Sequence, residues 1–286
     1  MTFPPRTIHS TIGEPAFPVS ELTRSTFLLQ PQGAALPPVD IPYLQFPGLL
    51  QFSRLRHAVY TRLGGVSLPP FQSLNVSGSV GDHGQHVAVN LQRIRRTFGS
   101  PHLVEMNQVH GSHLLILNHM DAATPDNGAP PADASATNLP GVALMVKQAD
   151  CQAVILFDPV KRALANVHCG WRGNIAGFLS KVIDKLRASF GCSPVEMRAA
   201  IGPSLGPCCA EFTSHEALFP AQFRRFMVRK NHFDLWEISR RQLLEAGLKK
   251  NNIEIAGICT RCRTDLFFSY RAEGSTGRFA TVVMLE

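Results

Sequence analysis

The sequence predicts one domain of the mixed α/β or α+β class. Apolar runs typical of short strands intermingle along the chain with stretches whose apolar residues recur at helical spacing, and no internal repeat stands out. The chain has 286 residues, of which 44% are hydrophobic and 17% charged, so it can bury one large core. Its seven cysteines are an odd number spread over a long chain, which favours reduced or ligand thiols over a disulfide framework.

The N-terminal half combines a proline-rich start with strands and one helix. Residues 1–45 lack periodicity, and we expect a loose extension ahead of a domain over residues 46–286. The expected elements are, in order, a strand pattern from near Leu49 to Thr61, an amphipathic helix that ends at Gly99, a strand, polar break and second strand over 104–117, and a loop over 118–140.

The C-terminal half predicts a strand hairpin followed by helices and further strands. A buried strand over 141–151 leads into two apolar runs, Ala153–Phe157 and Ala163–Val167, which a turn at Asp158-Pro159 separates. The remaining elements are a helix from about Ile175 to Phe190, a strand over 197–201, helical segments over 214–219 and 239–247, a strand over 253–262, a strand or loop over 267–273, and a last strand after a turn at 274–277.

Composition also limits the partners. The chain has no apolar run of about 18 residues, the length that crosses a bilayer. Its first residues lack the basic start and apolar core of a signal peptide, so we expect a cytoplasmic protein with no membrane partner. The net charge of +7 suits an anionic partner, but the basic residues are scattered. We therefore expect a small anionic substrate and no nucleic acid.

The predicted hairpin brings a thiol and an imidazole together. Cys151 comes just before its first strand and His168 just after its second, and such positions lie side by side in an antiparallel pair. This pair allows either a metal site or a nucleophile with its base. In the second case Cys151 and His168 would form a metal-free hydrolase of the thioester or amide type.

His110 shares the context of these two residues, a polar side chain at the edge of an apolar strand beside a small residue. Two imidazoles and one thiolate suit zinc, and three protein ligands leave a fourth position open for water or substrate, as in catalytic sites. The spacing of the three residues is too wide for a local zinc motif. The residues alone therefore also allow simple packing in a core.

The other cysteines form a weaker pattern. Cys259 and Cys262 make a C-x-x-C, and Cys208-Cys209 would complete a cysteine-rich structural zinc site. A lone C-x-x-C with an adjacent C-C favours a set of buried thiols over such a site.

Four arginines lie beside glycines or at strand edges, where a guanidinium can bind a phosphate or carboxylate: Arg62, Arg172, Arg271 and Arg278. Solvated arginines are the alternative for each. Asp133 and Asp150 are candidates for orienting a ligand histidine. Neighbours in a strand face opposite sides, so Asp150 can serve the site of Cys151 only if the strand has ended there.

A series of motifs resembles one known family in order from about residue 50 to the end. The motifs are TRLGGVS from Thr61, SLN from Ser73, NQVHG from Asn107, ADC from Ala149, HCGWRG from His168, IGPSLGPCC from Ile201, and FFSYR with TGR near the C-terminus. They resemble the laccase-domain or multicopper polyphenol oxidase-like family, later recognised as zinc-dependent purine nucleoside phosphorylases with adenosine deaminase activity. Cys169 stands where that family usually has Ala, and Ala210 where it usually has Tyr.

The resemblance implies a single-domain α/β/β/α layered sandwich and Zn²⁺ bound by His110, Cys151 and His168. It also implies phosphorolysis of adenosine, inosine and S-methyl-5'-thioadenosine to base and ribose 1-phosphate, with deamination of adenosine. The substrates would then be purine nucleosides and phosphate. An extra thiol at Cys169 would alter metal choice, and Ala210 would alter pocket shape.

The roles expected under this resemblance follow from side-chain chemistry. Asp150 or Asp133 would protonate the leaving ammonia, and Arg62 and Arg172 would hold phosphate with Asn75 as a neutral contact. Blue-copper oxidases need histidine pairs of the H-x-H type, which this sequence lacks, so copper would act only as a substitute at the zinc site. A non-catalytic cell-wall precursor editing factor is a further alternative.

Overall fold

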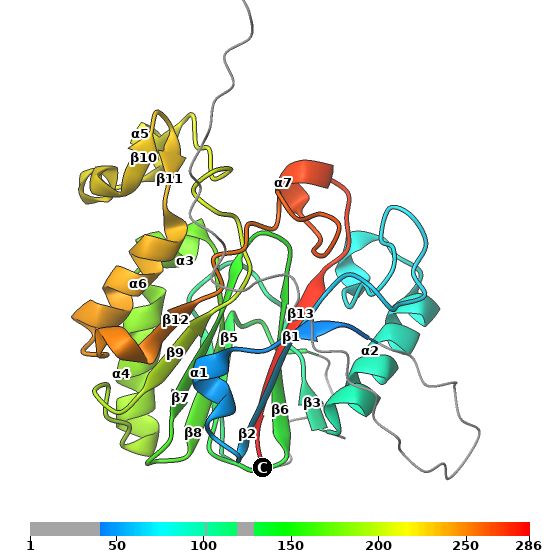
Figure 1. Cartoon of the computed structure of the whole chain (residues 1–286), viewed down its shortest axis with the longest axis horizontal. Helices are drawn as coiled ribbons and strands as arrows, with labels where there is room; N and C mark the ends of the chain where they lie inside the picture. The colour runs from blue at the N-terminus through cyan, green and yellow to red at the C-terminus, as the bar shows by residue number, and fades with distance from the viewer. Residues whose placement is uncertain (1–40, 101, 119–128) are drawn as a thin grey trace, which may run out of the picture.

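Two β-sheets lie face to face between helices in the computed structural model, which describes residues 41–100, 102–118 and 129–286. Helix α2 (Gly84–Phe98) covers the outer face of one sheet, while α4 (Phe178–Phe190) and α6 (Leu235–Glu245) cover the other (Figure 1). The arrangement is the expected α/β/β/α sandwich.

The first sheet has five strands in the order β1-β2-β13-β6-β3. Its strands are β1 (Tyr43–Leu44), β2 (Leu55–Tyr60), β13 (Phe279–Leu285), β6 (Val142–Gln148) and β3 (His102–Val104). All neighbours are antiparallel except β6 and β3. The last strand of the chain therefore lies in the middle of this sheet.

The second sheet has six strands in the order β12-β9-β7-β8-β5-β4. Its strands are β12 (Ile253–Ile255), β9 (Arg198–Ile201), β7 (Gln152–Asp158), β8 (Ala163–Cys169), β5 (Ala134–Thr137) and β4 (Leu114–Leu117). The central β7–β8 pair is the predicted hairpin, and the chain passes from one sheet to the other between β6 and β7.

Shorter elements complete the described chain. These are the helices α1 (Pro47–Leu50), α3 (Trp171–Ile175), α5 (His215–Leu218) and α7 (Tyr270–Glu273), and the hairpin of β10 (Met227–Arg229) and β11 (His232–Phe233).

Three apolar layers alternate with the sheets, because successive strand residues face opposite sides. Between the sheets, Val59 and Leu144 of the first pack with Ile155 of the second. Val154 and Leu156 face α4 and α6, whereas Ala58 and Tyr60 face α2. Burial on both faces explains why these strands read as continuous apolar runs.

Several sequence expectations were wrong in detail. The strand expected over 253–262 is confined to β12, and the strand or loop expected over 267–273 contains helix α7. The segment from Leu49 starts as helix α1, because Pro47 fits the first helical position, and the strand begins only at Leu55. Strand β5 lies inside the expected loop over 118–140. The helix expected from about Ile175 begins only at Phe178, as α4, because Gly177, with a φ of 64°, separates it from the short helix α3. Helix α6 begins four residues early, where Asp234 caps it by accepting from Glu237 N.

The proline-rich extension is described only in part. Residues 1–40 lie outside the described residues, as do 119–128 of the expected loop. Residues 41–45, expected to belong to the extension, contribute β1 to the first sheet, and Ile41 is buried.

Candidate active site

His110, Cys151 and His168 lie together at one end of the hairpin. The β7–β8 register pairs Ala153 with His168, and Cys151 occupies the bend just before β7. His110 comes from the loop between β3 and β4, where its φ of 58° turns the backbone. The three possible ligand atoms lie within 4.8 Å of one another. The structure therefore brings the predicted three residues into one site.

Asp133 links two of the three residues. Its Oδ1 lies 2.9 Å from His168 Nδ1 and accepts from His110 N, and its Oδ2 accepts from Gly111 N. The carboxylate is fully buried, and although burial acts against its charge, the hydrogen bonds from His168 and Gly111 lower its pKa. Asp133 thus contacts His168 at Nδ1 and leaves Nε2 for the site, as a partner of a ligand histidine does.

Cys151 and His168 shift the pKa of each other. Burial disfavours the Cys151 thiolate, but the charge of His168 and hydrogen bonds from both histidines lower its pKa to about 6. Burial also disfavours the His168 imidazolium, yet the charge of Cys151 and the bond to Asp133 raise its pKa to about 9. A thiolate at neutral pH is the form that serves as a metal ligand or as a nucleophile.

Gly170 leaves room for the thiolate. A Cβ at this position would lie 2.8 Å from Cys151 Sγ and 3.8 Å from His110 Cδ2. The adjacent Cys169 is among the residues that line the cavity but is not one of the three possible ligands. Its thiol donates to Asn174 Oδ1 at 3.2 Å and packs toward α4. Burial raises the pKa of Cys169, so it stays protonated. The expected effect of Cys169 on metal choice stays a prediction.

A cavity of about 580 Å³ opens over the three residues, a volume typical of small-molecule sites. Four cationic side chains line it: Lys147, Arg172, Arg271 and Arg278. Arg172 lies over the Trp171 ring, and Lys147 pairs with Glu105 at 3.5 Å. The cavity can therefore hold an anion beside the possible metal site.

Aromatic rings line the same cavity and were not singled out from the sequence. They are Trp171, Phe212 and the exposed Tyr270. The WRG and SYR motifs contained a signal for two of them, since each motif places the ring next to a candidate anion-binding arginine. Ala210 is fully buried and does not line the cavity, so the expected effect of this residue on the cavity is indirect at most.

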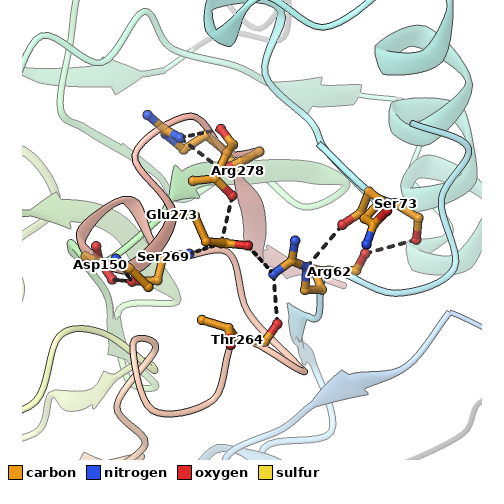
Figure 2. A network of polar contacts seen from close by, with 11 residues as sticks. Arg62, Ser73, Asp150, Thr264, Ser269, Glu273 and Arg278 are labelled. Carbon is orange, nitrogen blue, oxygen red and sulfur yellow. Dashed lines mark hydrogen bonds and ion pairs between the residues drawn. The ribbon is translucent and has the colours of Figure 1, made fainter. Parts of the chain in front are cut away.

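Asp150 lines the cavity in a bend with a φ of 83°, beyond the end of β6. Its Oδ1 accepts from Thr260 Oγ1 and Ser269 Oγ, both at 2.7 Å, and its Oδ2 accepts from Arg271 N at 2.6 Å. Figure 2 shows Asp150 beside Ser269 at the start of α7. Asp150 therefore anchors the segment that carries Tyr270 and Arg271.

Arg62 and Asn75, expected to contact phosphate, do not line the cavity. Arg62 donates from Nη1 to Thr264 O at 2.8 Å and to Glu273 Oε1 at 2.9 Å (Figure 2). Its guanidinium also lies 4.5 Å from the Phe268 ring centre. The Arg62 guanidinium thus holds α7 in place through Glu273.

Asn75 is equally engaged, because it is fully buried and its Oδ1 accepts from the backbone N of Arg278 at 2.8 Å. Both residues therefore support cationic or aromatic residues of the cavity, whereas Arg172 lines it directly.

Comparison with known proteins places the chain in a family. The family described as multi-copper polyphenol oxidoreductase laccase matches residues 56–286. The chain is 33% identical over 233 residues to "Purine nucleoside phosphorylase YfiH" of Shigella flexneri, covering 79% of this chain and 91% of that protein. It is 30% identical over 264 residues to a purine nucleoside phosphorylase of Bacteroides thetaiotaomicron, covering 86% and 97%.

The fold agrees with solved structures. The crystal structure of YlmD from Geobacillus stearothermophilus has a TM-score of 0.77 at 27% identity over 86% of this chain and 96% of that one. That of a Bacillus licheniformis YfiH protein has a TM-score of 0.76 at 28% identity. Within the described residues, no helix is long and apolar enough to span a membrane. The chain belongs to the family described as multi-copper polyphenol oxidoreductase laccase, whose curated relatives bear the name purine nucleoside phosphorylase.

Proposed function

We propose that the chain is a zinc-dependent purine nucleoside phosphorylase that acts on adenosine, inosine and S-methyl-5'-thioadenosine and also deaminates adenosine. The products of phosphorolysis are a free base and ribose 1-phosphate. The observation that carries this proposal is the three-residue ligand set at the floor of a cationic, aromatic-lined cavity. The names of the curated relatives support the same reaction class.

The donor set fits Zn²⁺. His110, Cys151 and His168 offer two imidazole nitrogens and a sulfur whose pKa is lowered to about 6, and Gly170 leaves space beside that sulfur. When bound, zinc supplies a Lewis acid and lowers the pKa of water at its open position. Copper can occupy the same donors as a substitute.

Different side chains of the cavity would bind the two substrates, phosphate and the purine nucleoside. Arg172, Arg271 and Arg278 present guanidinium groups to phosphate, which attacks the ribose carbon as the bond to the base breaks. Tyr270 and Trp171 offer ring faces on which a purine can stack. The Arg278 guanidinium also donates to Thr276 O and Gly277 O, which holds it in place.

Asp150 is the proposed acid for the leaving ammonia in deamination. In the described part of the chain its Oδ2 accepts one hydrogen bond, from Arg271 N, whereas a carboxylate oxygen has two lone pairs. Asp133 is unsuited to this role, because its two oxygens hold His110, Gly111 and His168 and its pKa is lowered.

A metal-free cysteine hydrolase is the second candidate, and one observation favours it. Asp133, His168 and Cys151 form a chain of polar contacts that resembles a nucleophile, base and orienting carboxylate. However, His110 also hydrogen-bonds to Cys151, and a nucleophile with one base needs no second imidazole. This candidate predicts an active protein without bound metal that alkylation of Cys151 inactivates.

Chromatography of products tests the proposal. Purified protein is incubated with adenosine, inosine or S-methyl-5'-thioadenosine, with and without phosphate. We expect adenine from adenosine only with phosphate, hypoxanthine from inosine only with phosphate, and inosine from adenosine in either case. Absence of every product from all three nucleosides would contradict the proposal and favour a non-catalytic role such as cell-wall precursor editing.

Variants and metal analysis separate the candidates. His110→Ala, Cys151→Ala and His168→Ala should each abolish both reactions and lower the zinc content, while Cys192→Ser, a buried cysteine packed outside the site, should change neither. Full activity in metal-free protein would contradict the zinc-dependent reaction. An active His110→Ala protein would remove His110 from the site.

A further inference from the structure

A second set of sulfur atoms gathers outside the lining of the cavity. Cys208 and Cys209 lie in the loop after β9, and Cys259 and Cys262 lie in the turns after β12. Their four Sγ atoms all lie within 4.8 Å of one another, with Cys262 Sγ 3.6 Å from Cys208 Sγ and 3.5 Å from Cys209 Sγ. The sequence pattern favours a set of buried thiols, whereas the structure brings the four cysteines into one cluster with Cys262 exposed.

We propose that these four cysteines form a structural zinc site that is distinct from the active site. Four sulfurs at about 2.3 Å from one tetrahedral ion lie about 3.8 Å apart, close to the distances observed here. A disulfide requires about 2.05 Å, and all seven cysteines are free. A full set of four thiolates leaves no open position, so this site is closed, unlike the set of two histidines and one cysteine.

The backbone around the cluster is built to hold it. Ser204 N donates to Ile258 O and Thr260 N donates to Ser204 O, each at 3.1 Å, so the two cysteine-bearing loops run side by side. Cys209 and Cys259 are buried, whereas Cys208 is half-buried and Cys262 is exposed. An ion can therefore reach the cluster from the side of Cys262.

Basic side chains surround the cluster, which would carry a net charge of about −2 with zinc and four thiolates. The Arg261 side chain hydrogen-bonds to Cys209, and Arg229 donates to Cys208 O at 2.7 Å. Arg271 donates to Glu211 O at 2.7 Å and lies 3.5 Å from Cys209 O. These charges offset that of a tetrathiolate centre, which a set of neutral buried thiols would not require.

The four-cysteine zinc site would hold one wall of the cavity in position. The loop of Cys208 and Cys209 also carries Leu205 and Phe212, which line the cavity, and the turn of Cys259 carries Thr260, which binds Asp150. A bound metal would join these two loops beside the isolated bridge between Ser204 and Cys259, beyond the ends of the paired strands β9 and β12. Its role is to position the wall, and no atom of the cluster lines the cavity.

Metal stoichiometry with cobalt as a spectroscopic probe tests this site. Zn²⁺ is measured in wild type, in Cys151→Ala and in the double variant Cys259→Ser/Cys262→Ser, and Cys192→Ser is the matched control. We expect the double variant to lose about one zinc per chain relative to wild type, and Cys192→Ser to lose none. Cys151→Ala tests the other site separately, so a failure of either assignment is recognisable.

Co²⁺ reports the number of thiolates directly, because sulfur-to-cobalt charge transfer grows with each bound thiolate. It is added to metal-free Cys151→Ala protein, in which the active-site thiolate is absent. We expect the strong absorption of a four-thiolate centre there. It should weaken to that of at most three thiolates in Cys151→Ala/Cys262→Ser, a change at the exposed cysteine that should leave the circular dichroism spectrum unchanged.

Two results would overturn the proposal. One is a cobalt spectrum without thiolate charge transfer in folded Cys151→Ala. The other is mass-spectrometric mapping of Cys208, Cys209, Cys259 and Cys262 in which purified native protein carries no zinc at them and is either fully alkylated or disulfide-bonded. Protection of all four from alkylation that ends when a chelator is added would support it.

Discussion

Asp133 fixes the two histidines of the active site through one buried carboxylate. It contacts His168 Nδ1 at 2.9 Å and binds the backbone at His110 and Gly111. We predict that Asp133→Asn weakens zinc affinity by about tenfold to about a hundredfold, since carboxylates that orient ligand histidines have effects of this size. Competition with a chromophoric chelator measures the affinity.

Asp158→Asn is the matched control for that prediction. Asp158 is also a fully buried carboxylate, and it accepts from Val160 N, Lys161 N and Ser193 N at the far end of the hairpin. Its replacement should lower the unfolding temperature without changing zinc affinity. Equal zinc affinities in Asp133→Asn and wild type would show that Asp133 does not orient a ligand.

The Cys151–His168 pair predicts a pH optimum of stability for the metal-free protein. The pKa of Cys151 falls from 9.0 to about 6 on folding, so its contribution is complete above pH 9.0 and is lost as pH falls through about 6. The pKa of His168 rises from 6.5 to about 9, so its contribution is complete below pH 6.5 and is lost as pH rises through about 9. Because the two groups titrate together, the pair stabilises the fold most between about pH 6 and about pH 9.

Thermal unfolding of chelator-treated protein from about pH 5 to about pH 10 checks this window. The difference in midpoint between wild type and Cys151→Ser should be largest near neutral pH and should shrink at both ends. Cys192→Ser should keep the wild-type profile. A difference that stays constant with pH would contradict the paired charges.

Sequence patterns located the three ligand candidates but not the roles of Arg62 and Asn75. The three candidates stand at ends of apolar runs, a signal that lies within a few neighbouring residues. The partners of Arg62, Thr264 and Glu273, are 202 and 211 residues away along the chain. Spacing cannot reveal such a contact, so a supporting arginine and a phosphate-binding arginine look alike in the sequence.

At the scale of elements, α7 depends on Arg62 for its position. The guanidinium binds Glu273 and Thr264 O and stacks near Phe268, and lysine cannot reproduce this planar fork. We predict that Arg62→Lys lowers kcat/KM for phosphorolysis and deamination alike, between about tenfold and about a hundredfold, because α7 carries Tyr270 at the cavity. Zinc content should not change.

Arg263→Lys is the control for that comparison, since Arg263 pairs with exposed Asp265. It should leave both activities near the wild-type values. Loss of phosphorolysis alone in Arg62→Lys, with deamination intact, would contradict a supporting role. It would indicate that Arg62 contacts phosphate directly.

The elements that periodicity predicted are those with a complete local signal. The α2 helix has apolar residues at helical spacing and Gly99 at its end, and the β7–β8 hairpin has two apolar runs around a turn. In contrast, β5 consists of small residues without an apolar pattern, and pairing with β4 and β8 makes it a strand. The sequence does carry a signal for the start of α6, since Asp234 and Glu237 have the spacing of a helix N-cap pair. The apolar spacing, however, indicated a start at Ser239.

At the scale of the whole molecule, the candidate active site lies at one of the points where the chain changes sheets. Strand β6 belongs to the five-stranded sheet and β7 to the six-stranded one, and Cys151 follows directly on the crossing. Periodicity predicted only a mixed class, because the central place of β13 and the stacking of two sheets come from contacts between the chain ends and its middle. The layered sandwich was predictable only through the family motifs.

Both proposed metal sites join segments that are distant along the chain, so metal should stabilise the whole fold. An ion that binds only the native state adds about 2.7 kcal/mol when its free concentration is a hundred times its Kd. For a domain of this size that corresponds to a rise in unfolding temperature of roughly 5 °C or more per site. We therefore predict that chelation lowers the unfolding midpoint of wild type in two separable parts.

Scanning calorimetry with and without chelator resolves the two parts. Cys151→Ala should lack the contribution of the active site, and Cys259→Ser/Cys262→Ser that of the four-cysteine cluster, so each should respond less to chelator than wild type. The combined triple variant should not respond at all, because the described chain then retains neither ligand set intact. Cys192→Ser should respond as wild type does. A triple variant whose midpoint still falls on chelation would show that the stabilising ion binds elsewhere, and both assignments would then lose their energetic support.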